Sequence, residues 1–375
     1  MAKPGRILIV GGGIAGLTAA AALHQRGFAA ELIERDAEWR TVGGGIAVQP
    51  NGMRVLRRLG IADAVERAGM VVRRWLFRDQ HGDVLCANDL EALWGAVGPF
   101  IGIERSKLQA SLLAGAAAVS CRLGIWITAL AQDDHGVSVA FNDGNTGHYD
   151  VVVGADGIAS TVRRLALGAA SPVYSGQMTW RSVAPLHPGK LEGVQFWLGD
   201  ACFFGLCPVG GGRTYGFGNV TAPHVHDPVP GRCERLRRHF AGFGGLVRDY
   251  LAALEGDERI HCGAVEWLES DQWHNGRVVL IGDAAHASSP MMGQGGCMAM
   301  EDALVLAEVL DSAADVESAL AAFAGRRRPR VTWVQQESRA VGKSLDMPPA
   351  MRNQALREHG TKKLCHRFEP LTAPP

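Results

Sequence analysis

The sequence predicts an α/β protein with a parallel-sheet domain assembled from separated segments, an inserted and mainly antiparallel β-sheet, and helices at the C-terminus. Three observations carry this prediction. A glycine-rich turn joins a strand to a helix near residue 11, a second glycine-rich segment opens a helix near residue 295, and short aromatic strand-like runs fill the region between Pro172 and His274. Such runs separated by Gly and Pro turns are typical of an antiparallel sheet.

The first strand and helix enclose a turn of the dinucleotide-binding type. Residues 6–10 predict a strand, which runs into Gly11-Gly12-Gly13-Ile14-Ala15-Gly16 and an alanine-rich helix to about Arg26. In this G-x-G-x-x-G pattern Gly11 permits the tight turn, Gly13 lets a pyrophosphate approach the backbone, and Gly16 allows close packing of helix on strand. A second strand ends at Glu34, 18 residues after Gly16, where an acid can bind a ribose hydroxyl. The domain is therefore predicted to be Rossmann-like.

A second strand–turn–helix unit lies in the last third of the chain. Residues 278–281 form a β-branched run that stops at Gly282-Asp283, and Gly293-Gln294-Gly295-Gly296 opens a helix that is apolar from Met298 through Leu310. A helix N-terminus carries roughly half a positive elementary charge and presents free N–H groups. This unit is therefore suited to bind an electron-rich group.

A third segment, VVVGADGIASTVR at residues 151–163, completes the pattern. Together the three segments resemble the single-component group A flavin hydroxylases, the para-hydroxybenzoate-hydroxylase-type FAD monooxygenases, and the resemblance covers roughly residues 5–340. It implies a Rossmann-like FAD-binding domain of the GR2/PHBH type with an inserted sheet that covers the flavin. We therefore expect bound FAD.

The resemblance also assigns cofactor contacts residue by residue. It implies a pyrophosphate turn, an adenosine side, a loop at the flavin edge, a segment that also touches the nicotinamide, an aspartate on the ribityl chain, and a loop that lines the flavin ring. In that order these are Gly11, Gly13, Ala15 and Gly16; Glu34, Arg35 and Leu130; Gly45 in the loop 43–46; Asp156 and Arg163; Asp283; and Pro290, Gly293, Gly295 and Gly296. Arg105 matches an arginine of the family that reaches the FAD.

The activity implied by the resemblance is NAD(P)H-dependent oxygen insertion. NADH or NADPH would reduce FAD, and a flavin C4a-hydroperoxide formed with O2 would transfer one oxygen atom to a small aromatic or polycyclic substrate or another electron-rich compound. The chain has no second G-x-G-x-x-G unit, so nicotinamide binding should be transient. Two alternatives stay open: a catalytically silent FAD-binding protein that protects an intermediate, and a flavin halogenase or reductase on the same fold.

The order of the motifs predicts a discontinuous FAD-binding domain. We assign residues 1–70, 100–171 and 275–325 to it, residues 71–99 and 172–274 to the substrate domain, and residues 326–375 to a C-terminal helical segment.

The substrate sheet is rich in aromatic side chains. Alternate residues of a strand face opposite sides, so only some can face the flavin, and the sequence leaves open which ones do. A flat organic substrate and a plain sheet core explain them equally well. Arg181 is a weak catalytic candidate that could orient a substrate anion, although a structural role is equally open, and the catalytic residues otherwise stay unknown. The aromatic residues are Trp180, Phe196, Trp197, Phe203, Phe204, Tyr215 and Phe217.

Two further residues invite chemical roles that we do not favour. Cys297 follows the glycine-rich loop and could be a redox centre or a flavin link, but a small buried helix residue is the preferred interpretation. His286 could act as a general base, but a structural place in the turn is preferred.

Composition excludes several kinds of partner. The 375 residues carry 38 basic and 38 acidic side chains, which argues against nucleic acid or an anionic membrane as partner. The basic run at residues 326–330 is interpreted as a solvated helix entry with Pro329 in the first turn.

Eight scattered cysteines without metal-ligand spacing predict no metal and a reducing, cytoplasmic location. No apolar run reaches the roughly 18 residues of a membrane span. A monomer or a homodimer is expected.

Overall fold

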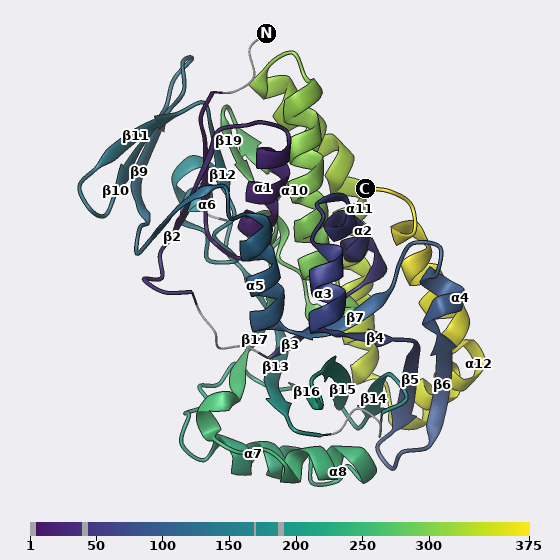
Figure 1. Cartoon of the computed structure of the whole chain (residues 1–375). Helices are drawn as coiled ribbons and strands as arrows, with labels where there is room; N and C mark the ends of the chain where they lie inside the picture. The colour runs from purple at the N-terminus through teal and green to yellow at the C-terminus, as the bar shows by residue number, and fades with distance from the viewer. Residues whose placement is uncertain (1–4, 40–43, 169, 187–190) are drawn as a thin grey trace.

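The computed structural model describes residues 5–39, 44–168, 170–186 and 191–375. Its upper half in Figure 1 is built on a six-stranded sheet with the order β18-β19-β12-β1-β2-β8. All neighbours in it are parallel except β18 and β19, as expected for strands joined by crossover helices. The strands are β1 (Ile7–Val10), β2 (Ala30–Glu34), β8 (Ser120–Leu123), β12 (Val151–Gly154), β18 (His274–Asn275) and β19 (Val278–Leu280).

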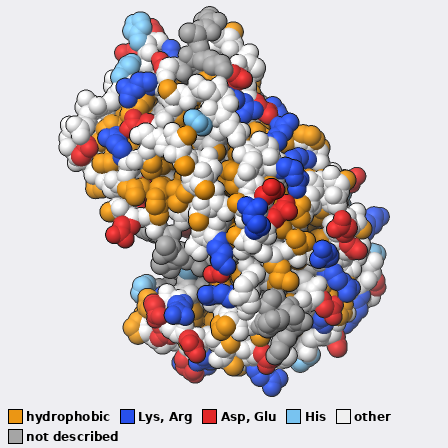
Figure 2. Space-filling view, in the orientation of Figure 1, with side chains coloured by type: hydrophobic (Ala, Val, Ile, Leu, Met, Phe, Trp, Pro, Cys, Tyr) orange, Lys and Arg blue, Asp and Glu red, His pale blue; other side chains and the backbone are white. Residues whose placement is uncertain are grey.

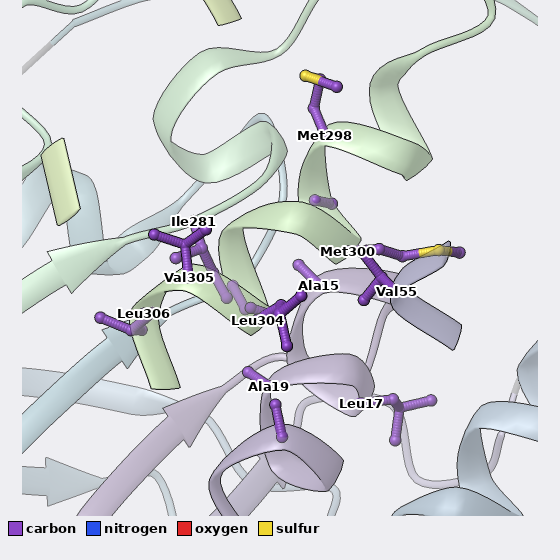
Figure 3. Packing of buried hydrophobic residues seen from close by; sticks show 14 of the residues in the cluster. Ala15, Leu17, Ala19, Val55, Ile281, Met298, Met300, Leu304, Val305 and Leu306 are labelled. Carbon is purple, nitrogen blue, oxygen red and sulfur yellow. The ribbon is translucent and has the colours of Figure 1, made fainter. Parts of the chain in front are cut away.

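Helix α1 (Ile14–Gln25) and helix α10 (Gly295–Ser312) pack against each other beside this sheet (Figure 3). The alanines of α1 are small enough for a close approach, and Ala15 and Ala19 lie toward Leu304 and neighbouring side chains of α10. Other helices of this half are α2 (Pro50–Arg58), α3 (Ala62–Ala68), α5 (Arg105–Gly115), α6 (Thr161–Ala166) and α9 (Asp283–His286).

Two three-stranded sheets flank the parallel sheet. One forms a projecting hairpin layer at the upper left of Figure 1, and the other joins the two halves of the molecule. The first contains β9 (Ile127–Gln132), β10 (Val137–Phe141) and β11 (Thr146–Tyr149), and the second β3 (Gly45–Val48), β4 (Met70–Val72) and β7 (Phe100–Glu104).

The lower half is a seven-stranded sheet with the order β17-β13-β16-β15-β14-β5-β6, antiparallel except for the pair β14 and β5. Helices α7 (Arg232–His239) and α8 (Gly245–Ala252) lie beneath it in Figure 1. Its strands are β5 (Arg74–Asp79), β6 (Val84–Asp89), β13 (Val173–Ala184), β14 (Val194–Leu198), β15 (Cys202–Gly210), β16 (Arg213–Thr221) and β17 (His261–Trp267).

The C-terminal part is helical, and one of its helices corrects a prediction. Helix α11 runs unbroken through Val316–Lys343, so Pro329 lies in its interior rather than in its first turn. Within the basic run, Arg327 is fully buried. The interpretation of this run as a solvated helix entry is therefore wrong. The remaining elements are α4 (Leu90–Trp94), α12 (Pro349–Phe368), η2 (Asp257–Arg259), η3 (Pro290–Met292), η4 (Ser344–Asp346) and η5 (Glu369–Leu371).

The predicted fold class is confirmed: an α/β core, a mainly antiparallel sheet and C-terminal helices are all present. The division into domains at the expected boundaries stays a prediction. Among the described residues, no helix combines the length and the apolar character that a bilayer crossing requires. On the face in Figure 2, basic and acidic side chains are interspersed.

Candidate active site

The three motif segments converge on one region of the structure. A Cβ placed on Gly282 would lie 3.0 Å from the Cβ of Ala15 in α1 and 3.1 Å from that of Ala299 in α10. A Cβ on Gly11 would lie 2.5 Å from the carbonyl oxygen of Ala155, in the third segment. Segments far apart in the sequence are thus held in direct contact by residues that have little or no side chain.

The first turn leaves open space at one glycine only. Gly11 has φ +108°, a conformation that favours glycine, and a Cβ on Gly16 would lie 1.9 Å from the carbonyl oxygen of Gly11. Gly13 instead is exposed, and a Cβ there would meet no heavy atom within 4 Å. The backbone N–H of Gly12 donates to the Glu34 carboxylate at 2.7 Å, which fixes the acid at the edge of the turn. This geometry leaves room for a pyrophosphate beside Gly13.

The N-terminus of α10 lies beside Asp283. A Cβ on Gly295 would be 3.9 Å from Asp283 Oδ1. Asp283 is exposed, yet protein surrounds it on most sides, and this desolvation raises the pKa of its carboxyl despite the opposing effects of His286, Arg105 and Arg181. An exposed carboxyl in such a concavity is well placed to accept hydrogen bonds from ligand hydroxyls.

A buried polar network holds the glycine-rich loop from behind. The Gln49 side chain donates to the Met292 carbonyl at 2.7 Å, and Gln294 donates to Gln49 at 2.7 Å. Asn51 donates to Gln294 at 2.9 Å and to Glu301 at 3.0 Å. Each of these polar groups is almost fully buried, so the network fixes the loop in one conformation.

The network continues into a cluster of buried charges under the turn at Asp283. Asp302 accepts from Gly282 N–H at 2.9 Å and from Arg327 Nε at 2.8 Å, and it lies 2.6 Å from His286 Nε2. Burial alone would raise the pKa of Asp302, but His286 and Arg327 lower it to about 2. His286 is 5% exposed and tied to Asp302, which agrees with the structural role preferred from the sequence.

The third segment is tied into the scaffold. Asp156 accepts from Ser160 Oγ at 2.5 Å and from the N–H of Thr161 at 2.7 Å at the start of α6, and burial raises the pKa of its carboxyl. The Arg163 guanidinium donates to three backbone carbonyls, including that of Ala284 at 2.8 Å, and the residue is 5% exposed. Asp156 therefore caps the start of α6, whereas Arg163 connects α6 to the turn after β19, and a direct contact of either side chain with a cofactor stays a prediction.

The seven-stranded sheet divides its aromatic residues between two faces. Trp180, Trp197 and Phe204 pack in the cluster with α7 and α8, where the Phe204 and Phe240 rings are 4.9 Å apart. The opposite face carries Arg181, Phe196, Phe203, Tyr215 and Phe217. This second face meets the start of β3, because a Cβ on Gly45 would lie 2.4 Å from the Cβ of Tyr215.

The comparison with protein families decides what this region is. Residues 5–338 match the family model described as an FAD binding domain. The chain belongs to the group A FAD-dependent aromatic monooxygenases. This match covers all three motif segments, and it shows an enzyme that binds FAD.

Relatives of known activity support this conclusion over nearly the whole chain. The monooxygenase is 36% identical to a 3-amino-4-hydroxybenzoate 2-monooxygenase of Streptomyces platensis, over 94% of this chain and 91% of the relative. It is 34% identical to the aurachin C monooxygenase/isomerase of Stigmatella aurantiaca, over 90% and 88%. The crystal structure of Klebsiella pneumoniae HpxO with FAD and uric acid superposes with a TM-score of 0.91 at 29% identity, covering 99% of this chain and 97% of that one.

The other predicted site residues lie around the monooxygenase's motif segments. Arg105 is exposed at the first position of α5, and Arg181 lies on the sheet face, where its Cβ would be 3.4 Å from a Cβ on Gly44. Gly43, part of the same predicted loop, lies outside the described residues. Arg35 is exposed after β2, and Leu130 lies within β9. Gln49, Asn51 and Glu301 were missed; no motif marks them.

Cys297 is packed rather than reactive. It is 1% exposed, its sulfur would lie 2.8 Å from a Cβ on Gly52, and burial raises the pKa of its thiol to about 12. We expect Cys297→Ser to retain one FAD per protein and to change turnover less than twofold, because a serine fits the same space. Flavin absorbance and steady-state rates check this. Purification of the variant without flavin would contradict a packing role.

Proposed function

We propose that the protein is a single-component, NADH- or NADPH-dependent monooxygenase that inserts one oxygen atom from O2 into a small aromatic or other electron-rich substrate by way of a flavin C4a-hydroperoxide. The observation that carries the proposal is the aromatic face of the seven-stranded sheet, which lies against the loop at Gly45 and reaches Met291 beside the glycine-rich loop. Aromatic walls of this kind suit a flat ring, and a dry enclosure slows wasteful loss of the activated oxygen.

The cofactor contacts follow from the open space at the motif turns. We propose that the FAD pyrophosphate lies at Gly13, that Glu34 binds the adenosine ribose and Asp283 the ribityl chain, and that Gly295 and Gly296 offer backbone N–H groups to the flavin ring. A Cβ placed on Gly295 would lie 3.9 Å from Asp283 Oδ1, and this proximity supports the arrangement. FAD then supplies the redox chemistry, while the chain orients it and excludes water.

The substrate class is narrowed by the relatives. One acts, by its name, on 3-amino-4-hydroxybenzoate, and a solved structure contains uric acid. These two compounds are small and planar, which agrees with the aromatic face of the sheet.

All eight cysteines are free, and we propose a reducing compartment, the cytoplasm.

A stopped-flow experiment tests the proposal. The flavoprotein is reduced anaerobically with NADPH or NADH and mixed with oxygenated buffer containing urate, 3-amino-4-hydroxybenzoate or related planar ring compounds. We expect reduction by a nicotinamide, a transient oxygenated flavin spectrum and an oxygenated product. Failure of both nicotinamides to reduce the flavin with every compound present would favour a silent or partner-reduced flavoprotein.

A further inference from the structure

Asn219 occupies the middle of the substrate-side face of the seven-stranded sheet. The strand register places it opposite Thr179 of β13 and opposite Phe203 of β15. Residues directly opposite one another in an antiparallel sheet point to the same side, so Asn219 shares the face of Phe203 and of Phe217 two residues earlier in β16. It is therefore on the side that lies toward Met291, not on the side covered by α7 and α8.

The Asn219 carboxamide has no hydrogen-bond partner. The residue is 1% exposed, and neither Nδ2 nor Oδ1 has a partner among the described residues. Its polar neighbours are engaged elsewhere: the Thr179 hydroxyl donates to the Gly218 carbonyl at 3.1 Å, and the Gln177 amide donates to the Gly342 carbonyl at 3.4 Å. A buried amide that leaves both a donor and an acceptor unpaired is rare in folded proteins and calls for an explanation.

The surroundings of Asn219 are apolar and aromatic. The rings of Phe203 and Phe217 meet edge to face with centroids 6.1 Å apart, and Leu345 and Met291 belong to the same cluster. Such walls accept a planar ring but offer it no hydrogen bonds. A carboxamide set among them would be the polar group that fixes the ring's orientation.

We propose that Asn219 determines substrate specificity by pairing with a neutral edge of the substrate ring in which an N–H and a C=O are adjacent, as in a lactam. The carboxamide offers the complementary C=O and N–H side by side, and it carries no charge that would demand an ionic partner. Solvent does not reach either amide atom, so the neighbouring rings move aside as the substrate enters. This inference rests on the proposed function and names the substrate class of the same site.

Ligand binding to the oxidised holoenzyme tests the assignment. The probes are quinolin-2(1H)-one and its N-methyl derivative, which keeps the ring and the carbonyl but lacks the N–H, and binding is followed by the change in flavin absorbance. We expect the wild type to bind the lactam at least about tenfold more tightly than the N-methyl compound. Asn219→Leu should weaken lactam binding by roughly tenfold to a hundredfold and leave the N-methyl compound unchanged.

A second buried asparagine supplies the control. Asn88 is 5% exposed, and its Nδ2 donates to the Trp75 carbonyl at 3.1 Å. Asn88→Leu should lower the melting temperature without altering the lactam preference, whereas Asn219→Leu should not lower it, because it removes an unpaired group. Weak or equal binding of the two probes by the wild type, or a large loss of melting temperature in Asn219→Leu, would overturn the proposal. Because this assay needs no turnover, failure of NAD(P)H oxidation would count against the proposed function alone.

Discussion

Replacing Gly13 with valine should release FAD while leaving the protein folded. No heavy atom lies within 4 Å of a Cβ at this position, and the residue has φ −79° and ψ −169°, an extended conformation that valine adopts without strain. The added methyl groups would occupy the space assigned to the pyrophosphate. We expect a loss of FAD affinity of about a hundredfold or more, roughly 3 kcal/mol, measured by reconstitution of the apoprotein and by the flavin content after desalting.

Two other glycines make the Gly13 experiment specific. Gly242 also has open space around it and no positive φ, and it lies between α7 and α8, so Gly242→Val should keep its FAD. Gly16→Val should not fold, because its Cβ would lie 1.9 Å from the carbonyl oxygen of Gly11. Full flavin content in folded Gly13→Val would mean that the pyrophosphate does not lie at this turn.

The contrast between Gly13 and Gly16 shows what the sequence could predict. The spacing of the glycine turn and the strand that precedes it fix the backbone path locally, so the motif predicted both the close packing at Gly16 and the free space at Gly13. The same holds for the helix that begins at Gly295, where the predicted apolar run from Met298 is buried as expected.

Which side chains of the substrate sheet lie toward the flavin could not be predicted in the same way. Strand periodicity sorts Trp180 from Arg181 and Phe203 from Phe204, but it does not say which set meets the flavin side. That choice depends on where α7 and α8 pack, and they cover Trp180 and Phe204. The packing of these helices is a tertiary contact, and the alternation of side chains along a strand does not encode it.

The prediction of a solvated helix entry at residues 326–330 is wrong for a related reason. A proline favours the first turn of a helix, and that rule placed a helix start at residues 326–330. The stronger signal lay in α10, where Glu301 and Asp302 stand side by side in an apolar helix; buried carboxylates need cationic partners. Arg327 supplies one, with Nη1 2.7 Å from Glu301 and Nε 2.8 Å from Asp302.

Arg327→Met should therefore cost the protein about 3–5 kcal/mol of stability, the usual effect of breaking a fully buried ion pair. All three side chains, Arg327, Glu301 and Asp302, are 0% exposed, so removal of the guanidinium takes from two buried carboxylates the one cation that they share. Glu301 then keeps Arg330 at 2.8 Å, and Asp302 keeps His286 at 2.6 Å, as close ionic partners among the described residues. Urea unfolding of the holoprotein, followed by tryptophan fluorescence, measures the change. The stability of Arg327→Lys should lie between those of the wild type and Arg327→Met, because an ammonium keeps the charge but not the bidentate geometry of the guanidinium.

The adjacent Arg326 offers a matched control in the same helix. Its side chain is 41% exposed and pairs with Glu308 at 2.9 Å, so Arg326→Met should cost about 1 kcal/mol or less. Equal losses of stability in the two variants would show that burial of the charges does not determine the size of the effect.

Acid unfolding adds a second readout for Arg327→Met. The folded-state pKa of Asp302, about 2, lies below the ordinary value of about 3.9, so its contribution is present above roughly pH 4 and is lost as the pH falls toward 2. Because Arg327 helps to lower that pKa, the methionine variant should lose part of this pH dependence, whereas Arg326→Met should retain all of it.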